Sequence, residues 1–116
     1  MSEKTYPQFR TSKDIDIRFA PQVGVMSCGY NHLVRAFGIP TFSVDNNDTF
    51  EGTEQCAWNV QFENGLTVCI AEERGFGKAE QHYERATSWK VNSRDERTYN
   101  WIKQIIRDSN PNVTGA

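Results

Sequence analysis

The sequence lacks a long hydrophobic run and lacks an excess of either charge. No apolar stretch among its 116 residues approaches the roughly 18 residues that a membrane-spanning helix needs. No apolar segment follows Met1–Lys4, so we expect neither a membrane-spanning protein nor one exported by an ordinary signal peptide. The 13 basic and 15 acidic residues are mixed along the chain and leave a net charge of −2. Because no long basic run occurs, the composition does not favour general nucleic-acid binding.

Cysteine and histidine are also scarce. The chain has three cysteines, Cys28, Cys56 and Cys69, and two histidines, His32 and His82. An odd number of cysteines at irregular spacing predicts reduced thiols in the cytoplasm rather than a disulfide framework. Neither Cys-x-x-Cys nor His-x-x-x-His occurs. We therefore expect no metal site, and nothing in the sequence indicates a cofactor.

A β-hairpin over residues 55–73 is the clearest structural signal. Two β-prone runs flank Asn64-Gly65, a dipeptide that favours a two-residue type I′ turn in which both residues have positive φ. The register that follows pairs Trp58 with Ala71, Val60 with Cys69 and Phe62 with Thr67. It places Leu66, Val68 and Ile70 on the other face, with Asn59 and Gln61. Because both faces carry apolar residues, we expect a central pair of strands covered on one side and partly covered on the other.

The remaining elements follow from periodicity and from helix-end signals. Alternating apolar and charged residues predict an edge strand over residues 14–19. A helix is expected after residue 24, with Ser27 as N-cap and Gly38 at its end. A further strand is expected within residues 83–92, and a capping box formed by Ser93 and Glu96 predicts a helix to about residue 107. The three tryptophans, Trp58, Trp89 and Trp101, are expected in the core.

These elements predict an α+β fold. We expect an antiparallel sheet, a meander of three to five strands, with two helices packed on one face. The length fits one domain over residues 14–108. Residues 1–13 are expected to form a flexible N-terminal arm and residues 109–116 a C-terminal tail.

Some of these motifs resemble a pattern found in small phage and actinobacterial proteins. They are Phe37-Gly38-Ile39-Pro40, the run Trp58-x-Val60-x-Phe62-Glu63-Asn64-Gly65, and Trp89 before a C-terminal helix. The resemblance covers roughly residues 29–106, and the longer segment from Arg74 to Tyr83 departs from it. It implies a small viral accessory domain acting in the host cytoplasm. It supplies no active-site residues.

The segment after the hairpin has the composition of a ligand-binding loop. Its glycines free the backbone to approach a ligand, its cations suit phosphates, and its aromatic rings suit a base. The candidate residues are Arg74, Gly75, Phe76, Gly77, Lys78, His82, Tyr83 and Arg85. The spacing in this segment is not that of a phosphate-binding P-loop, so the segment does not indicate a hydrolase. The alternative is a solvated loop without a ligand.

Two weaker candidates lie near the first predicted helix. Cys28 and His32 are four residues apart, hence on one helix face, and a thiol at a helix N-terminus has a lowered pKa. A Cys/His nucleophile pair would follow, although no acid that orients the histidine is identifiable. The alternative is a small buried cysteine and a surface histidine. The turn Gly24–Ser27 could bind an anion at the helix N-terminus, or Ser27 could simply cap the helix.

Three functions follow from these candidates. The first is a non-enzymatic protein that sequesters a small anionic ligand, such as a nucleotide signal of host defence. The second is an inhibitor or adaptor that acts on a host protein through the acidic loop Asp45–Glu54 or through an exposed helix face. The third is a Cys28/His32 hydrolase. Because a two-layer fold leaves one sheet face open, we also expect a homo-oligomer paired across that face.

Overall fold

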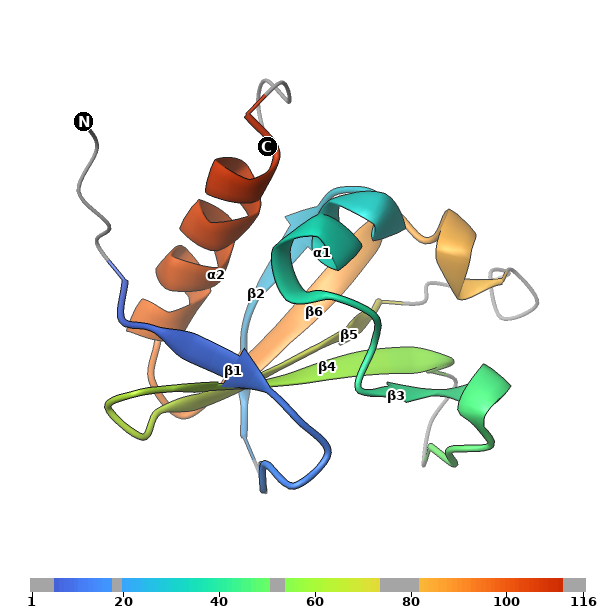
Figure 1. The fold of residues 1–116 in the computed structure, drawn as a ribbon, viewed down its shortest axis with the longest axis horizontal. Helices are drawn as coiled ribbons and strands as arrows, with labels where there is room; N and C mark the ends of the chain where they lie inside the picture. Colours follow the sequence, from blue (N-terminus) through green and yellow to red (C-terminus); the bar gives the residue numbers. More distant parts are fainter. Residues whose placement is uncertain (1–5, 18–19, 51–53, 74–81, 112–116) are drawn as a thin grey trace.

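The computed structural model describes residues 6–17, 20–50, 54–73 and 82–111 (Figure 1). The elements in chain order are β1 (Phe9–Thr11), β2 (Gln22–Ser27), α1 (Tyr30–Phe37), β3 (Phe42–Ser43), the 3₁₀ turn η1 (Val44–Asn46), β4 (Cys56–Phe62), β5 (Thr67–Glu72), the 3₁₀ turn η2 (Tyr83–Arg85), β6 (Ser88–Ser93) and α2 (Arg97–Ser109). The predicted α+β class is confirmed, because both helices pack against an antiparallel sheet.

The sheet is larger than the sequence predicts. Within the described residues it has six strands in the order β1-β4-β5-β6-β2, with β3 also paired to β4. The meander β4-β5-β6 agrees with the expectation. The two end strands come from segments predicted otherwise, because β1 lies in the expected loose arm and β2 overlaps the start of the expected first helix.

The predicted hairpin is present, but its register is wrong by one residue. Phe62 N–H donates to Leu66 O at 2.8 Å, so the loop has three residues, and Trp58 faces Ile70 while Val60 faces Val68. Gly65 has a φ of +93° while Asn64 keeps a negative φ, which is a type I turn followed by a glycine bulge. The extra loop residue turns every β5 side chain to the opposite face. Val68 and Ile70 therefore join Trp58 in the core.

The first helix begins later than predicted. Residues 22–27 pair with β6, so Ser27 lies in a strand and caps no helix. Gly29 is the N-cap of α1, and its N–H donates to His32 Nδ1 at 3.0 Å. Gly38, with a φ of +83°, ends the helix as expected. The proposed anion-binding turn at residues 24–27 is thereby ruled out, because no helix begins there.

The second helix also begins later than its predicted capping box. Ser93 is the last residue of β6, where its hydroxyl donates to Thr67 O at 2.8 Å and accepts from Asp95 N–H at 3.2 Å. Asp95 Oδ1 instead accepts from Arg97 N–H at 2.9 Å, at the first residue of α2. The predicted capping box over Ser93 and Glu96 was therefore wrong, because the Ser93 hydroxyl forms its hydrogen bonds in the turn between β6 and α2.

The core lies between the sheet and the two helices. Trp58 and Trp89 are fully buried there, with their rings 5.5 Å apart, and Trp101 packs half-buried against Phe62. On the opposite sheet face Ala57 and Ala71 are also buried. The strand predicted over residues 14–19 is absent from residues 14–17, and Phe19 lies outside the described residues. Ile15 is instead buried beside Asn59, whose side-chain amide donates to the Ile15 carbonyl.

Candidate functional site

The predicted ligand loop is described only at its end. Residues 74–78 lie outside the described residues. His82 directly precedes η2, and Tyr83 and Arg85 belong to it. His82 and Arg85 are exposed, whereas Tyr83 is buried.

Asp45, the first residue of the acidic loop, contacts this segment although it lies far from it in the sequence. Tyr83 Oη donates to Asp45 Oδ2 at 2.6 Å, and His82 Nε2 lies 3.5 Å from the same oxygen. Asp45 belongs to η1, so a contact across 38 positions joins the two 3₁₀ turns. Tyr30 of α1 adds a third ring, 5.4 Å from that of Tyr83. We call Tyr30, Asp45, His82, Tyr83 and Glu84 the η1–η2 surface.

Local contacts determine the orientation of the His82 ring. Its Nδ1 accepts from Glu84 N–H at 3.3 Å, so the ring proton resides on Nε2 and points toward Asp45. The His82 and Tyr83 rings lie 4.2 Å apart and are tilted by 31°. The Glu84 carboxylate lies 3.7 Å from Nδ1 and would form an ion pair only with a protonated ring. In its neutral form, His82 is therefore oriented by its neighbours.

The two tyrosines of the η1–η2 surface are protonated near neutral pH. Burial raises the pKa of Tyr83 well above its usual value of 10.0, and the hydrogen bond to Asp45 and the charge of that carboxylate raise it further. Burial is also the largest cause of the raised pKa of Tyr30. Neither phenol would act as a base near neutral pH.

The described part of this surface is acidic rather than basic. The side chains of Asp45 and Glu84 are 59% and 61% exposed. Among the described residues of the predicted ligand loop, Arg85 is the one lysine or arginine. Val44, beside Asp45, is 41% exposed. Two exposed carboxylates, the exposed His82 ring, the half-buried Tyr30 ring and an exposed aliphatic residue suit a cationic group better than an anion.

The Cys28–His32 pair lacks the properties of a nucleophile. Cys28 lies between β2 and α1, and burial raises the pKa of its thiol from 9.0 to about 11. The thiol is therefore protonated near neutral pH, whereas the thiolate is the nucleophile. His32 Nδ1 is occupied by the Gly29 N–H. The local sequence suggested activation only because it suggested a helix that included Cys28.

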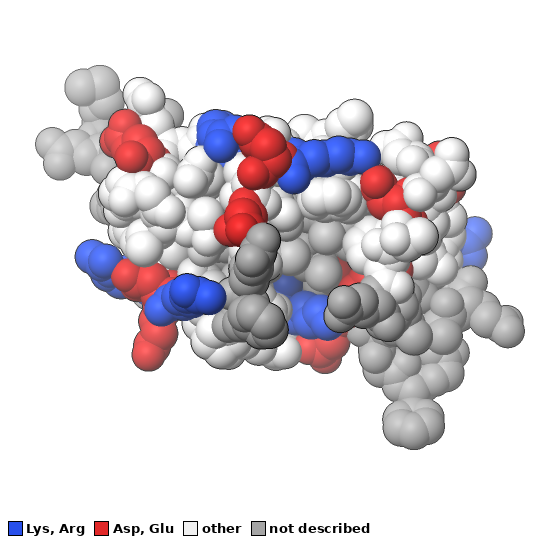
Figure 2. All heavy atoms as spheres, turned by 90° about the horizontal axis from the view of Figure 1, so that it is seen from below, with Lys and Arg blue, Asp and Glu red and all other residues white. Residues whose placement is uncertain are grey.

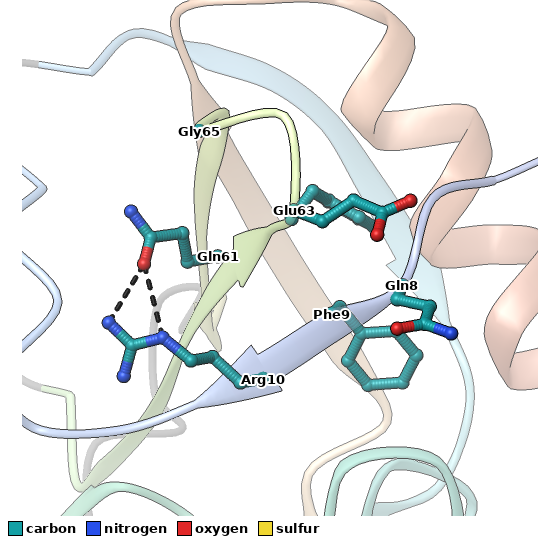
Figure 3. A pocket seen from close by; sticks show the side chains of 7 residues that line it. Gln8, Phe9, Arg10, Gln61, Glu63 and Gly65 are labelled. Atoms are coloured by element: carbon teal, nitrogen blue, oxygen red, sulfur yellow. Dashed lines mark hydrogen bonds between the residues drawn. The ribbon is translucent and has the colours of Figure 1, made fainter.

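The hollow beside β1 does not gather polar groups toward a common point. It has a volume of about 350 Å³ and lies where β1 meets the hairpin (Figure 3). Arg10 points to one side, where it donates to Gln61 Oε1 and pairs with Asp14 at 3.0 Å. The Phe9 ring lies on the other side of the strand pair. These contacts account for the Arg10 cation and leave no convergent site.

Charge is also dispersed on the sheet face opposite the helices. Figure 2 shows that side seen from below, where basic and acidic side chains alternate and neither sign forms a continuous patch. Among the described residues no group of histidine, cysteine or acidic side chains could hold a metal ion. No helix within the described ranges is long and apolar enough to cross a membrane.

Tyr30, Asp45 and Glu84 are the members of the η1–η2 surface that the predicted ligand residues did not include. The acidic composition of residues 45–54 pointed to the η1 side of the surface, and the predicted ligand loop, which includes residues 82–85, pointed to the η2 side. Their contact is long-range, and neither segment carries a pattern that predicts it. No protein-family model, curated protein or solved structure matches the chain.

Proposed function

We propose that the protein is a non-enzymatic protein-binding module whose η1–η2 surface receives a basic side chain of a partner. The observation that carries this proposal is the Asp45 carboxylate, which Tyr83 holds at 2.6 Å while more than half of the Asp45 side chain stays exposed. A carboxylate held in place loses little side-chain entropy when a cation arrives. An inhibitor or adaptor of a host protein would use such a surface.

The neighbouring groups support a guanidinium or ammonium group in particular. Glu84 supplies a second carboxylate, and the rings of His82 and Tyr30 lie against Tyr83. A cation gains from both the carboxylates and the ring faces, and arginine is enriched among the residues that dominate protein interfaces. Val44 offers an apolar contact beside the charge.

Binding of a labelled basic probe peptide, such as a hexapeptide of alternating arginine and leucine, tests this function. Asp45→Asn and Glu84→Gln should each weaken binding about threefold to tenfold, because each removes one carboxylate. Fluorescence anisotropy at low and at physiological salt measures the affinity. Glu63→Gln is the matched control, since Glu63 is exposed in the hairpin turn and carries the same charge. Equal weakening in all three variants would mean general attraction and would contradict the proposal.

A small anionic ligand is the second candidate function. The exposed Arg85 supports it, together with Arg74 and Lys78 in the same segment of the sequence. A cyclic dinucleotide at 100 times its dissociation constant would stabilise the fold by about 2.7 kcal/mol and raise the midpoint of thermal unfolding by several degrees. Arg85→Ala should reduce that shift. Absence of any shift with cyclic di- and trinucleotides would remove this candidate.

A further inference from the structure

β2 is an edge strand of the described sheet and has few of the usual protections. It is an end strand of the sheet, and Gln22–Ser27 contains neither a charged residue nor a proline. Natural edge strands are commonly blocked by charges, prolines or bulges because their free backbone groups pair with other strands. A register shift lies between Gln22 and Gly24, but the stretch from Gly24 to Ser27 is regular.

The hydrogen-bond pattern shows which backbone groups of β2 face outward. Cys28 N–H donates at 3.1 Å to the carbonyl of Thr87, the residue directly before β6. Because bonded and non-bonded pairs alternate in an antiparallel ladder, Val25 and Ser27 turn their backbone groups away from β6. Tyr99 Oη donates to Val25 O at 2.9 Å, as an outward carbonyl allows. That carbonyl keeps a second lone pair.

A pocket lies directly beside this edge. It has a volume of about 150 Å³ and lies between β2 and α2, with Met26, Cys28 and Ile106 among its apolar lining residues. Cavities of about 150 Å³ hold a benzene-sized group. One side chain of leucine or phenylalanine size therefore fits, and the flexible thioether of Met26 can adapt to it.

Lys103 places a positive charge at the same groove. It lines the pocket, and its ammonium nitrogen lies 4.8 Å from the centre of the Tyr99 ring. The groove thus combines outward strand donors that pair with no other strand of the described sheet, an apolar pocket and one cation along the line from β2 to α2. An extended peptide needs these three features for its backbone, one apolar side chain and a neighbouring carboxylate.

We propose that β2 binds an extended peptide of a partner protein as an added antiparallel strand. One apolar side chain of the peptide enters the pocket between β2 and α2, and a carboxylate next to it meets Lys103. A second copy of this chain suits the edge less well, because β2 offers no acidic residue to Lys103. The inference is independent of the η1–η2 surface, since it uses neither η1 nor η2.

Selection of random heptapeptides displayed on phage tests the inference on the full chain. Enriched sequences should pair an apolar residue with aspartate or glutamate. A synthetic peptide of the enriched sequence should shift the amide signals of Val25 and Ser27 in nuclear magnetic resonance spectra. Val25→Pro removes an outward donor and is tolerated at an edge, whereas Val25→Thr keeps the donor as the matched control. We expect roughly tenfold weaker binding for Val25→Pro and little change for Val25→Thr.

Two further variants keep the test decisive if Val25→Pro does not fold. Lys103→Glu should weaken the peptide at least severalfold, while Tyr99→Phe should leave binding unchanged or strengthen it by freeing the Val25 carbonyl. Three results would overturn the inference: no enrichment, amide shifts at Asp45 and His82 in place of β2, or a dimer that Val25→Pro converts to monomer. Amide shifts at Asp45 and His82 would still favour the proposed function, so the two proposals fail separately.

Discussion

Gly24 is a residue whose identity is set by one neighbouring ring. A Cβ at this position would lie 2.4 Å from Tyr99 Cε1, closer than non-bonded carbon atoms approach. The ring is held where it is because the Tyr99 hydroxyl donates to Val25 O. The contact explains why a strand otherwise rich in larger residues has glycine here.

Gly24→Ala should therefore destabilise the fold by about 1–3 kcal/mol, the usual cost of overpacking. Urea unfolding followed by tryptophan fluorescence measures the change. The double variant with Tyr99→Ala should lose less than the sum of the two single variants, because removal of the ring relieves the clash. Additive losses in this cycle would refute the steric account.

At the residue scale, burial was the property that the sequence predicted best. Trp58 and Trp89 are buried as expected, because large apolar side chains on a β-prone run have no better environment. The hydrogen-bond partners of side chains were predicted poorly. His32 was assigned to Cys28 by helical spacing, but its ring accepts from the backbone of Gly29, and only the true start of the helix reveals this.

At the element scale, the hairpin turn controls which side chains enter the core. Gly65 takes a φ of +93°, where an L side chain costs about 1–2 kcal/mol. Gly65→Ala should lower the free energy of unfolding by that amount, with urea denaturation as the measurement. Asn64→Ala is the comparison, and it should cost less, because Asn64 has negative φ and loses only its side-chain hydrogen bond to Leu66 N–H. A larger loss for Asn64→Ala would contradict the turn assignment.

The errors at the element scale share one physical cause. Asn64-Gly65 is compatible with both a two-residue and a three-residue loop, and the choice depends on burying Val68 and Ile70 rather than on the dipeptide itself. Likewise Gln22–Ser27 has no strong local preference, and pairing with β6 makes it a strand. Elements with strong local signals, such as β4 and the end of α1 at Gly38, were predicted correctly.

At the scale of the whole molecule, long-range contacts create the features that the sequence did not reveal. Tyr6 Oη donates to Asp108 Oδ2 at 2.9 Å across 102 positions, which attaches the expected loose arm to the end of α2. The η1–η2 surface depends on the Asp45–Tyr83 contact, and the β2 groove depends on α2 crossing an edge strand. Local composition identified some members of both sites, but it could not bring them together.

Because several tyrosine and cysteine side chains are buried, the protein should lose stability at alkaline pH. Burial raises the pKa of Cys28 and of Cys69 from 9.0 to about 11, and it is the largest cause that raises the pKa of Tyr6 from 10.0 to about 12. Tyr83 is raised as well. Above about pH 9 the unfolded chain releases protons that the folded chain retains, so the free energy of unfolding must fall as pH rises.

The stabilisation from these groups is thus complete below about pH 9 and is lost as the pH rises toward 11 and 12. The urea midpoint should be lower at about pH 10.5 than at about pH 8, with the slope of the transition unchanged. Tyr83→Phe removes one of the titrating groups, and its midpoint should fall less over the same range. A midpoint that stays constant to about pH 10.5, or that falls equally in the variant, would show that these side chains are accessible to hydroxide in the folded protein.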